Sequence, residues 1–207
     1  MKPSEYVAKV RTGLNRTNWV SYEPFFVALC QAYADRGEWT ELERFFSTAL
    51  RIGCAPATLK RVRQAYVAMM DFRAELQSPL AAAVAQANAR PEIKAVYFEY
   101  CFDGGEGSSS DFFLCRSYDR EDDAWASHFS MSTDVVKGPS VRKLMDYDPD
   151  FEVSYEEETV VEAFYFSHLL AAVGRPLERL SSPLTRPFGF SQHDISIVHV
   201  SPSFSLD

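Results

Sequence analysis

The chain has 207 residues, of which 46% are hydrophobic and 14% aromatic, and its formal net charge at pH 7 is −8. This length and composition support a buried core in one large domain or two small ones, and they exclude an intrinsically disordered chain. No apolar run approaches the roughly 20 residues of a membrane span, and the first residues lack the apolar stretch of a signal peptide. We therefore expect a cytoplasmic protein without a membrane partner.

The charge is divided unevenly along the chain. Residues 1–90 carry 12 basic and 8 acidic side chains, whereas residues 91–207 carry 9 basic and 21 acidic side chains. The acidic excess is concentrated in residues 119–158, which hold 12 acidic and 4 basic side chains. Such a field repels nucleic acid and attracts a basic partner. The alternative is that these acidic side chains only keep an aromatic-rich domain in solution.

The first half of the chain is predicted to be helical. A short helix is expected over residues 4–13, and a second begins at Ser21 and stops at Gly37. The Thr-x-x-Glu sequence of residues 40–43 is typical of a capping box, so a third helix is expected to begin at Thr40 and to end at Gly53. Over residues 25–50 this helical hairpin resembles one tetratricopeptide unit, with Tyr33, Gly37, Phe46 and Ala49 at the usual offsets. A tetratricopeptide solenoid needs about three stacked repeats and no second copy is visible, so we interpret the segment as an ordinary helical hairpin.

A longer helix is predicted to begin at Pro56, with an apolar stripe broad enough to be buried against the hairpin. Ser78-Pro79 is expected to interrupt it, and an alanine-rich helix follows over residues 80–89. Composition and charge both change near Pro91. We therefore divide the chain into a helical region, residues 1–90, and an α+β region, residues 91–207, packed together as one unit.

The second half of the chain is predicted to form an antiparallel sheet. Residues 95–102 alternate aromatic and smaller side chains, a glycine- and serine-rich turn follows, and residues 111–118 return as a second strand. Residues 125–131 are expected to form a third strand, and residues 194–200 a late one. Residues 177–193 are punctuated by prolines and are expected to be irregular.

One long helix interrupts the strands. Ser154 and Glu157 match a capping box, and Gly174 followed by Pro176 supplies the stop. Its apolar positions nearly encircle the helix, which predicts burial on all sides. His168 lies among them and is interpreted as a hydrogen-bonded core residue. The four cysteines lie in apolar runs without Cys-x-x-Cys spacing, so we expect free thiols.

One segment approaches a metal motif. Asp146, Asp148, Asp150 and Glu157 fall at the first, third, fifth and twelfth positions of an EF-hand loop. The sixth position requires glycine for a backbone with positive φ, and here it is Phe151, so we predict no calcium site. No nucleophile elbow, His-Glu-x-x-His pair or phosphate-binding glycine loop is present in the sequence. We expect neither a metal nor another cofactor, and not an enzyme.

A family resemblance is carried by residues 94–129. The succession Lys-Ala-Val-Tyr-Phe-Glu-Tyr, a glycine-serine turn, Asp-Phe-Phe-Leu-Cys, the acidic run of residues 119–123 and Trp-Ala-Ser-His-Phe resembles small bacterial immunity proteins of polymorphic toxin systems. The resemblance implies a protein-binding inhibitor that neutralises a cognate toxin. An acidic surface suits a basic partner, such as a nuclease domain.

The expected protein is therefore α+β, with an N-terminal helical layer packed on a C-terminal antiparallel sheet and one long buried helix. The predicted partner is a basic toxin domain and not a nucleic acid. Two alternatives remain, a helical adaptor or regulatory module that uses the face of residues 25–76, and an enzyme of unknown chemistry. The predicted recognition surface combines acidic side chains with two tyrosines as anchors; it consists of Tyr118, Asp119, Glu121, Asp122, Asp123, Asp146, Tyr147, Asp148 and Asp150.

Overall fold

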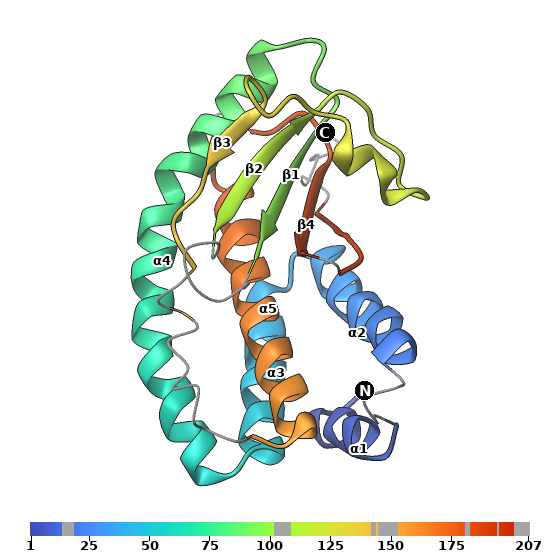
Figure 1. Cartoon of the computed structure of the whole chain (residues 1–207), viewed down its shortest axis with the longest axis vertical. Helices are drawn as coiled ribbons and strands as arrows, with labels where there is room; N and C mark the ends of the chain where they lie inside the picture. The colour runs from blue at the N-terminus through green and yellow to red at the C-terminus, as the bar shows by residue number, and fades with distance from the viewer. Residues whose placement is uncertain are drawn as a thin grey trace.

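A computed structural model describes residues 1–13, 19–101, 109–141, 144, 153–180, 183–193 and 195–200. Helices make up the first part of the chain and a sheet with one further long helix makes up the second, as predicted for an α+β protein (Figure 1). The helices are α1 (Pro3–Gly13), α2 (Trp19–Ala34), α3 (Trp39–Gly53), α4 (Pro56–Ala89) and α5 (Tyr155–Leu177). The strands are β1 (Ala95–Tyr100), β2 (Ser110–Cys115), β3 (Val135–Lys137), β4 (Phe188–Gln192) and β5 (Val198–Val200), and a 3-10 helix, η1, covers Asp123–Ser127.

The helical layer is organised around α3 and α5, which lie side by side (Figure 1). The apolar residues of α3 repeat at helical spacing, so that one stripe of the helix is buried; it comprises Leu42, Phe45, Phe46, Ala49 and Leu50. Tyr6 of α1 meets the rings of Phe45 and Phe46 edge-on at 5.8 and 5.3 Å between centroids. These contacts tie α1 to the hairpin of α2 and α3.

The sheet has the strand order β3-β2-β1-β4-β5. Its pairings are antiparallel except for β1 and β4, which are parallel, with Val96 opposite Phe188 and Phe98 opposite Phe190. The prediction of an antiparallel sheet is therefore wrong for this pair. After β1 the chain forms β2, η1, β3 and α5 before it returns as β4. A parallel pair of strands requires a long crossover of this kind. The proline-punctuated segment of residues 177–193, which was expected to be irregular, contributes β4, an interior strand between β1 and β5.

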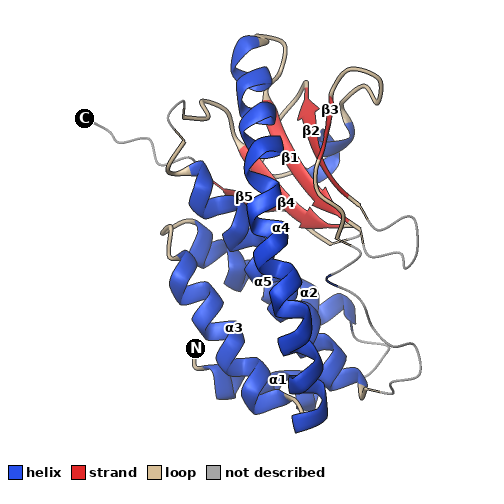
Figure 2. Ribbon diagram, turned by 90° about the vertical axis from the view of Figure 1, so that its left-hand side faces the viewer, coloured by secondary structure: helices blue, strands red, loops and turns tan. Residues whose placement is uncertain are grey.

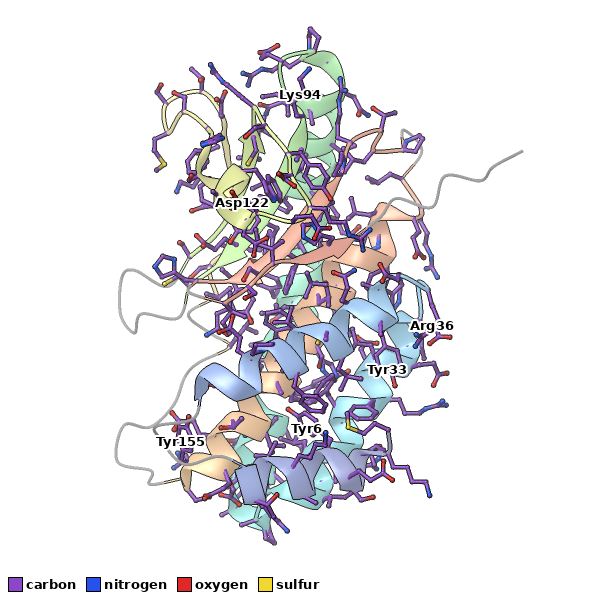
Figure 3. All side chains as sticks on the ribbon, turned by 90° about the vertical axis from the view of Figure 1, so that its right-hand side faces the viewer. Tyr6, Tyr33, Arg36, Lys94, Asp122 and Tyr155 are labelled. Carbon is purple, nitrogen blue, oxygen red and sulfur yellow. The ribbon has the colours of Figure 1, made fainter. Side chains whose placement is uncertain are left out.

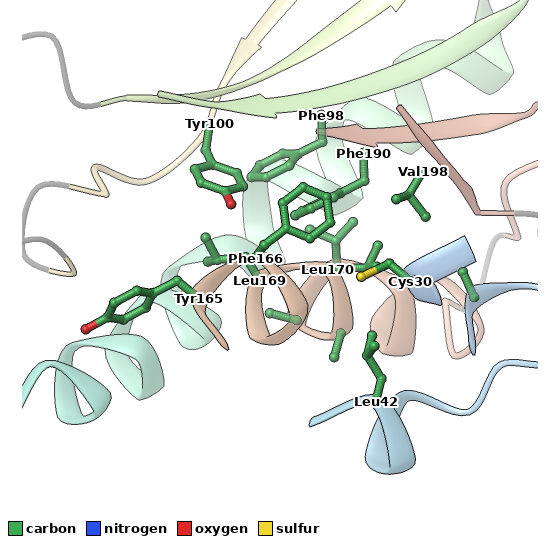
Figure 4. Close-up of a cluster of buried hydrophobic side chains, with 14 of the residues drawn as sticks. Cys30, Leu42, Phe98, Tyr100, Tyr165, Phe166, Leu169, Leu170, Phe190 and Val198 are labelled. Atoms are coloured by element: carbon green, nitrogen blue, oxygen red, sulfur yellow. The ribbon is translucent and has the colours of Figure 1, made fainter. Parts of the chain in front are cut away.

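One face of the sheet packs on the helices. On this face, Phe98 stacks on Phe190 at 5.5 Å, and Phe166 of α5 meets Phe190 edge-on at 5.0 Å (Figure 4). Helix α4 runs the length of the molecule and contacts β1, β2 and β3 (Figure 2). The main hydrophobic cluster therefore contains residues from both regions of the chain, from Tyr6 to Val200.

The opposite face of the sheet is covered by the segment between β2 and β3. Trp125 is buried there with Tyr97 and Phe113, which project from β1 and β2. Residues 125–131 are thus not the third strand that we predicted. Asp122 accepts a hydrogen bond from the backbone N–H of Ala124 at 3.0 Å and begins η1, and the third strand is β3. Trp125 and Phe129, four residues apart, both reach the sheet without an extended backbone between them.

Several predicted helix boundaries also differ from the structure. Helix α5 does not stop at Gly174 but continues through Pro176 to Leu177. Helix α4 continues through Pro79, because the carbonyl that loses its donor there belongs to Glu75, which lies on an exposed turn. Helix α3 begins at Trp39 after Glu38, without a side-chain cap, so Thr40 lies inside the first turn and forms no capping box.

The start of α5 agrees with the prediction in part. The Ser154 hydroxyl accepts a hydrogen bond from the Glu157 N–H at 3.2 Å. The Glu157 carboxylate does not return to Ser154, however; it accepts hydrogen bonds from the Ala55 N–H and, at 3.0 Å, from the Thr58 hydroxyl at the start of α4. A carboxylate at the N-terminus of a helix is favoured by the helix dipole, so Glu157 joins α4 to α5.

His168 is a hydrogen-bonded core residue, as predicted. Its Nδ1 lies 2.8 Å from the Phe164 carbonyl and its Nε2 lies 3.3 Å from the Ser47 hydroxyl. The four cysteines are free thiols, also as predicted. None of the described helices combines the length and the apolar character that crossing a bilayer requires.

Candidate functional site

The segment of residues 116–134 carries the described part of the predicted recognition surface. Its apolar side chains, chiefly Trp125 and Phe129, pack on the sheet, and the acidic side chains of residues 119–123 face outward. Asp122 marks the position of this segment over the sheet (Figure 3). We name the stretch from Tyr118 to Asp123 the acidic turn.

The carboxylates of the acidic turn also shape its backbone. Asp119 Oδ1 accepts a hydrogen bond from the Glu121 N–H at 2.9 Å, and Asp122 caps η1. Asp123 Oδ2 accepts a hydrogen bond from the Ile197 N–H at 3.1 Å, which links the turn to the chain just before β5. Because each of these carboxylates has a backbone partner, the acidic turn is held in one conformation.

Tyr118 packs against Trp125 and His199 beneath the acidic turn, on the side of the sheet. Its ring lies 5.1 Å from Trp125 and 5.9 Å from His199, edge-on to both, and its hydroxyl lies 3.3 Å from His199 Nδ1. Burial raises the pKa of Tyr118 and lowers the pKa of His199, although the carboxylate of Asp123 opposes the latter shift. The ring of Tyr118 is half-buried, so a partner would meet one side of it.

Arg120 is the basic residue within the acidic turn, and it reaches back toward α2. Its guanidinium lies 3.5 Å from Asp35 Oδ1. This exposed ion pair contributes little stability, but it draws the positive charge away from the outer side of the turn. Asp119, Glu121, Asp122 and Asp123 are all exposed.

A buried carboxylate fixes the other end of the covering segment. Asp134 is fully buried and binds Arg90 at 2.7 Å and Arg116 at 2.9 Å. Burial alone would raise its pKa, but hydrogen bonds from Arg90, the Ser130 N–H and Thr133 outweigh burial and hold the pKa of Asp134 at about 2. Asp134 therefore stays ionised and ties the covering segment to the end of α4.

The other predicted surface residues, Asp146, Tyr147, Asp148 and Asp150, lie outside the described residues. Glu157, the twelfth position of the EF-hand pattern, is described and caps α4. Within the described part of the chain, no three His, Cys, Asp or Glu side chains gather closely enough to hold a metal ion.

A basic groove that no sequence pattern indicated lies between α4 and α5. Its cavity has a volume of about 280 Å³ and is lined by three arginines, Arg73, Arg175 and Arg179, among other residues. Arg175, in the last turn of α5, and Arg179, just after this helix, are four residues apart, a spacing that the sequence does show. Arg73 is about a hundred residues away along the chain, and nothing in the sequence places it beside them.

No protein-family model matches this chain, and the chain has no significant similarity to a curated protein or to a solved structure.

Proposed function

We propose that this protein is a protein-binding inhibitor of the immunity-protein kind, which neutralises a basic toxin domain through the acidic turn. The observation that carries the proposal is the construction of that turn. Its four acidic side chains are exposed, while their backbone is held by the Asp119, Asp122 and Asp123 hydrogen bonds. A surface fixed before binding loses little conformational entropy when a partner arrives.

The charge on this surface supports a basic protein partner. Aligned negative charge speeds the encounter with a positive surface and suppresses wrong partners. The half-buried ring of Tyr118 beside the carboxylates offers the aromatic contact that often dominates interface affinity. The same field opposes binding to nucleic acid. We place the protein in the cytoplasm, where free thiols such as its four cysteines are typical.

If a neighbouring gene encodes a toxin domain, co-expression with that domain tests the proposal. Cells that express this domain alone should stop growing, and co-expression of the protein should restore growth. The two purified proteins should form a complex of defined stoichiometry on a sizing column. Failure to restore growth and failure to form the complex would together refute the proposal for that partner.

A second candidate function is favoured by one observation on α4. Tyr66, Val67 and Met70 are 38%, 66% and 52% exposed and lie within little more than one turn of this helix. An apolar patch of this kind is typical of a docking face, and it falls within the residue 25–76 face of the adaptor alternative. Replacing Val67 and Met70 by aspartate should abolish partner binding if the protein is an adaptor, and should leave toxin neutralisation intact if the acidic turn is the interface.

A further inference from the structure

The basic groove between α4 and α5 contains more positive charge than its neighbours neutralise. Arg73 and Arg175 share one carboxylate, that of Glu43 on α3, with Arg73 on Oε1 and Arg175 on Oε2, the latter at 2.7 Å. Among the described residues, Arg179 forms no ion pair. Three guanidinium groups therefore surround a cavity beside a single carboxylate.

The hydrogen-bond donors of the groove are also incompletely satisfied. Each guanidinium has five N–H donors, and Glu43 takes one from Arg73 and one from Arg175. The Arg73 Nε atom is shielded from solvent and has no acceptor among the described residues. A buried donor without a partner costs free energy, so an anion that supplied acceptor oxygens there would be stabilised.

The cavity of the groove exists because small side chains line part of it. Ala171 and Ala172 of α5 lie where a longer side chain would fill the space against α4, and Pro176 and Leu180 bound the cavity on the same side. Arg73 and Arg175 are 18% and 27% exposed, which lowers the screening of their charges by water. A cavity of about 280 Å³ lies near the lower limit for small-molecule sites.

We propose that this groove binds a small phosphate-bearing anion, with Arg73, Arg175 and Arg179 as its ligands. Guanidinium groups match the oxygens of a phosphate in pairs, and a dianion balances the charge that Glu43 leaves uncompensated. Free phosphate and a phosphomonoester share this chemistry. The groove is formed by α4, α5 and the turn after α5, whereas the acidic turn lies on the segment that covers the opposite face of the sheet, so this site is independent of the proposed inhibitor function.

The test measures thermal stability at constant ionic strength with inorganic phosphate, glycerol 3-phosphate, acetate or chloride. The midpoint should rise with the logarithm of the phosphate or glycerol 3-phosphate concentration above the dissociation constant, and by about 3 °C at ten times that constant. A rise with phosphate alone identifies the free ion as the ligand, and a rise with both identifies the phosphate group. An equal rise with acetate, or none with any anion, would overturn the proposal.

Matched variants separate binding from the general effect of phosphate on proteins. Arg179→Gln removes a groove guanidinium that forms no ion pair with the described residues, so folding should be unaffected. Arg63→Gln removes the same charge from an exposed position on α4, outside the groove. The logarithmic rise in the midpoint should disappear in Arg179→Gln and persist in Arg63→Gln. A rise that is equal in both variants is a solvent effect and contradicts the site.

Discussion

At the residue scale, two titrating side chains of α5 act on stability in opposite directions. Burial, with a smaller contribution from Glu158, raises the pKa of Glu162 from 4.5 to about 7. Burial lowers the pKa of His168 from 6.5 to about 4, although its contact with the Phe164 carbonyl works against that shift. The folded protein thus holds a proton on Glu162 that the unfolded chain releases, and lacks a proton on His168 that the unfolded chain takes up.

The signs follow from these proton balances. The contribution of Glu162 is complete below about pH 4.5 and is lost as the pH rises to about 7. The contribution of His168 is complete above about pH 6.5 and is lost as the pH falls to about 4. Between about pH 4.5 and pH 6.5 the free energy of unfolding changes in opposite directions with Glu162 and His168, and the two changes largely cancel. His199, whose pKa burial also lowers, acts in the same direction as His168, so the wild-type free energy of unfolding should fall on acidification below about pH 6.5 by the contribution of His199.

Glu162→Gln removes the pH dependence of stability that comes from Glu162 and leaves that of His168. We expect the variant to be more stable than the wild type at pH 8, by up to about 3 kcal/mol, and to lose stability steadily on acidification. Urea unfolding at pH 5, 6, 7 and 8 measures this, with Glu75→Gln, an exposed change on α4, as the control. A variant whose pH profile runs parallel to that of the wild type would show that the pKa of Glu162 is not raised in the folded protein.

Another residue-scale feature is the close packing of Gly174 on Trp39. A Cβ at Gly174 would lie 2.5 Å from the Trp39 ring, whose indole N–H donates to Glu178 Oε1 at 2.7 Å. Gly174→Ala should lower the free energy of unfolding by about 1–2 kcal/mol, because overpacking exceeds the gain in helix propensity. Gly53→Ala is the control, since its Cβ would meet the Val160 methyl groups at 3.2 Å, where a small shift suffices. Equal stabilities of the two variants in urea would contradict this account.

At the element scale, α2 protects one edge of the sheet. Strand β5 is an edge strand, and the Gln31 side chain binds its backbone like a further strand, accepting from the His199 N–H and donating to the His199 carbonyl, both at 2.7 Å. Glu23 of α2 accepts from the N–H and hydroxyl of Ser196 at 2.7 Å. Edges that are covered in this way do not recruit other chains.

Gln31→Ala should uncover this edge. We expect a loss of about 1–3 kcal/mol from the two backbone hydrogen bonds, and faster hydrogen exchange at the His199 amide with little change at the amides of β1. Gln64→Ala, an exposed substitution on α4, is the control. Unchanged protection of the His199 amide would mean that Gln31 does not hold the edge.

The elements that sequence patterns predicted are those whose partners are close along the chain. Alternating aromatic residues identified β1 and β2, and the Ser154 cap identified the start of α5. The parallel partner of β1 lies about 90 residues away, so no local pattern indicated β4 as its neighbour. The residues after Asp122 have the alternation of a strand. Because the Asp122 side chain accepts a hydrogen bond from the backbone there, these residues form η1 and not a third strand.

At the scale of the whole molecule, the acidic turn and the basic groove are two separate charged surfaces of opposite sign. The sequence predicted the acidic residues themselves, because their excess is visible in the composition. It did not predict that Asp119, Asp122 and Asp123 hold their own backbone, nor that Tyr118 supports the turn, because those contacts depend on β5 and Trp125. The groove joins residues of α4, α5 and the turn after α5, and it was not predictable from spacing.

The central claim is that the acidic turn is the surface that a basic partner meets. A suitable variant combines Glu121→Lys with Asp119→Asn and Asp122→Asn, since asparagine keeps the oxygen that accepts the backbone hydrogen bond. Asp71→Lys with Glu75→Lys makes the same change in net charge on exposed positions of α4. All three proteins should have the same melting temperature within about 2 °C.

The decisive measurement is the association rate of each protein with the purified toxin domain as a function of salt concentration. At low salt, the acidic-turn variant should associate at least about ten times more slowly than the α4 control, and the difference should shrink as salt screens the charges. If the folded acidic-turn variant associates as fast as the α4 control at every salt concentration, the acidic turn is not the recognition surface.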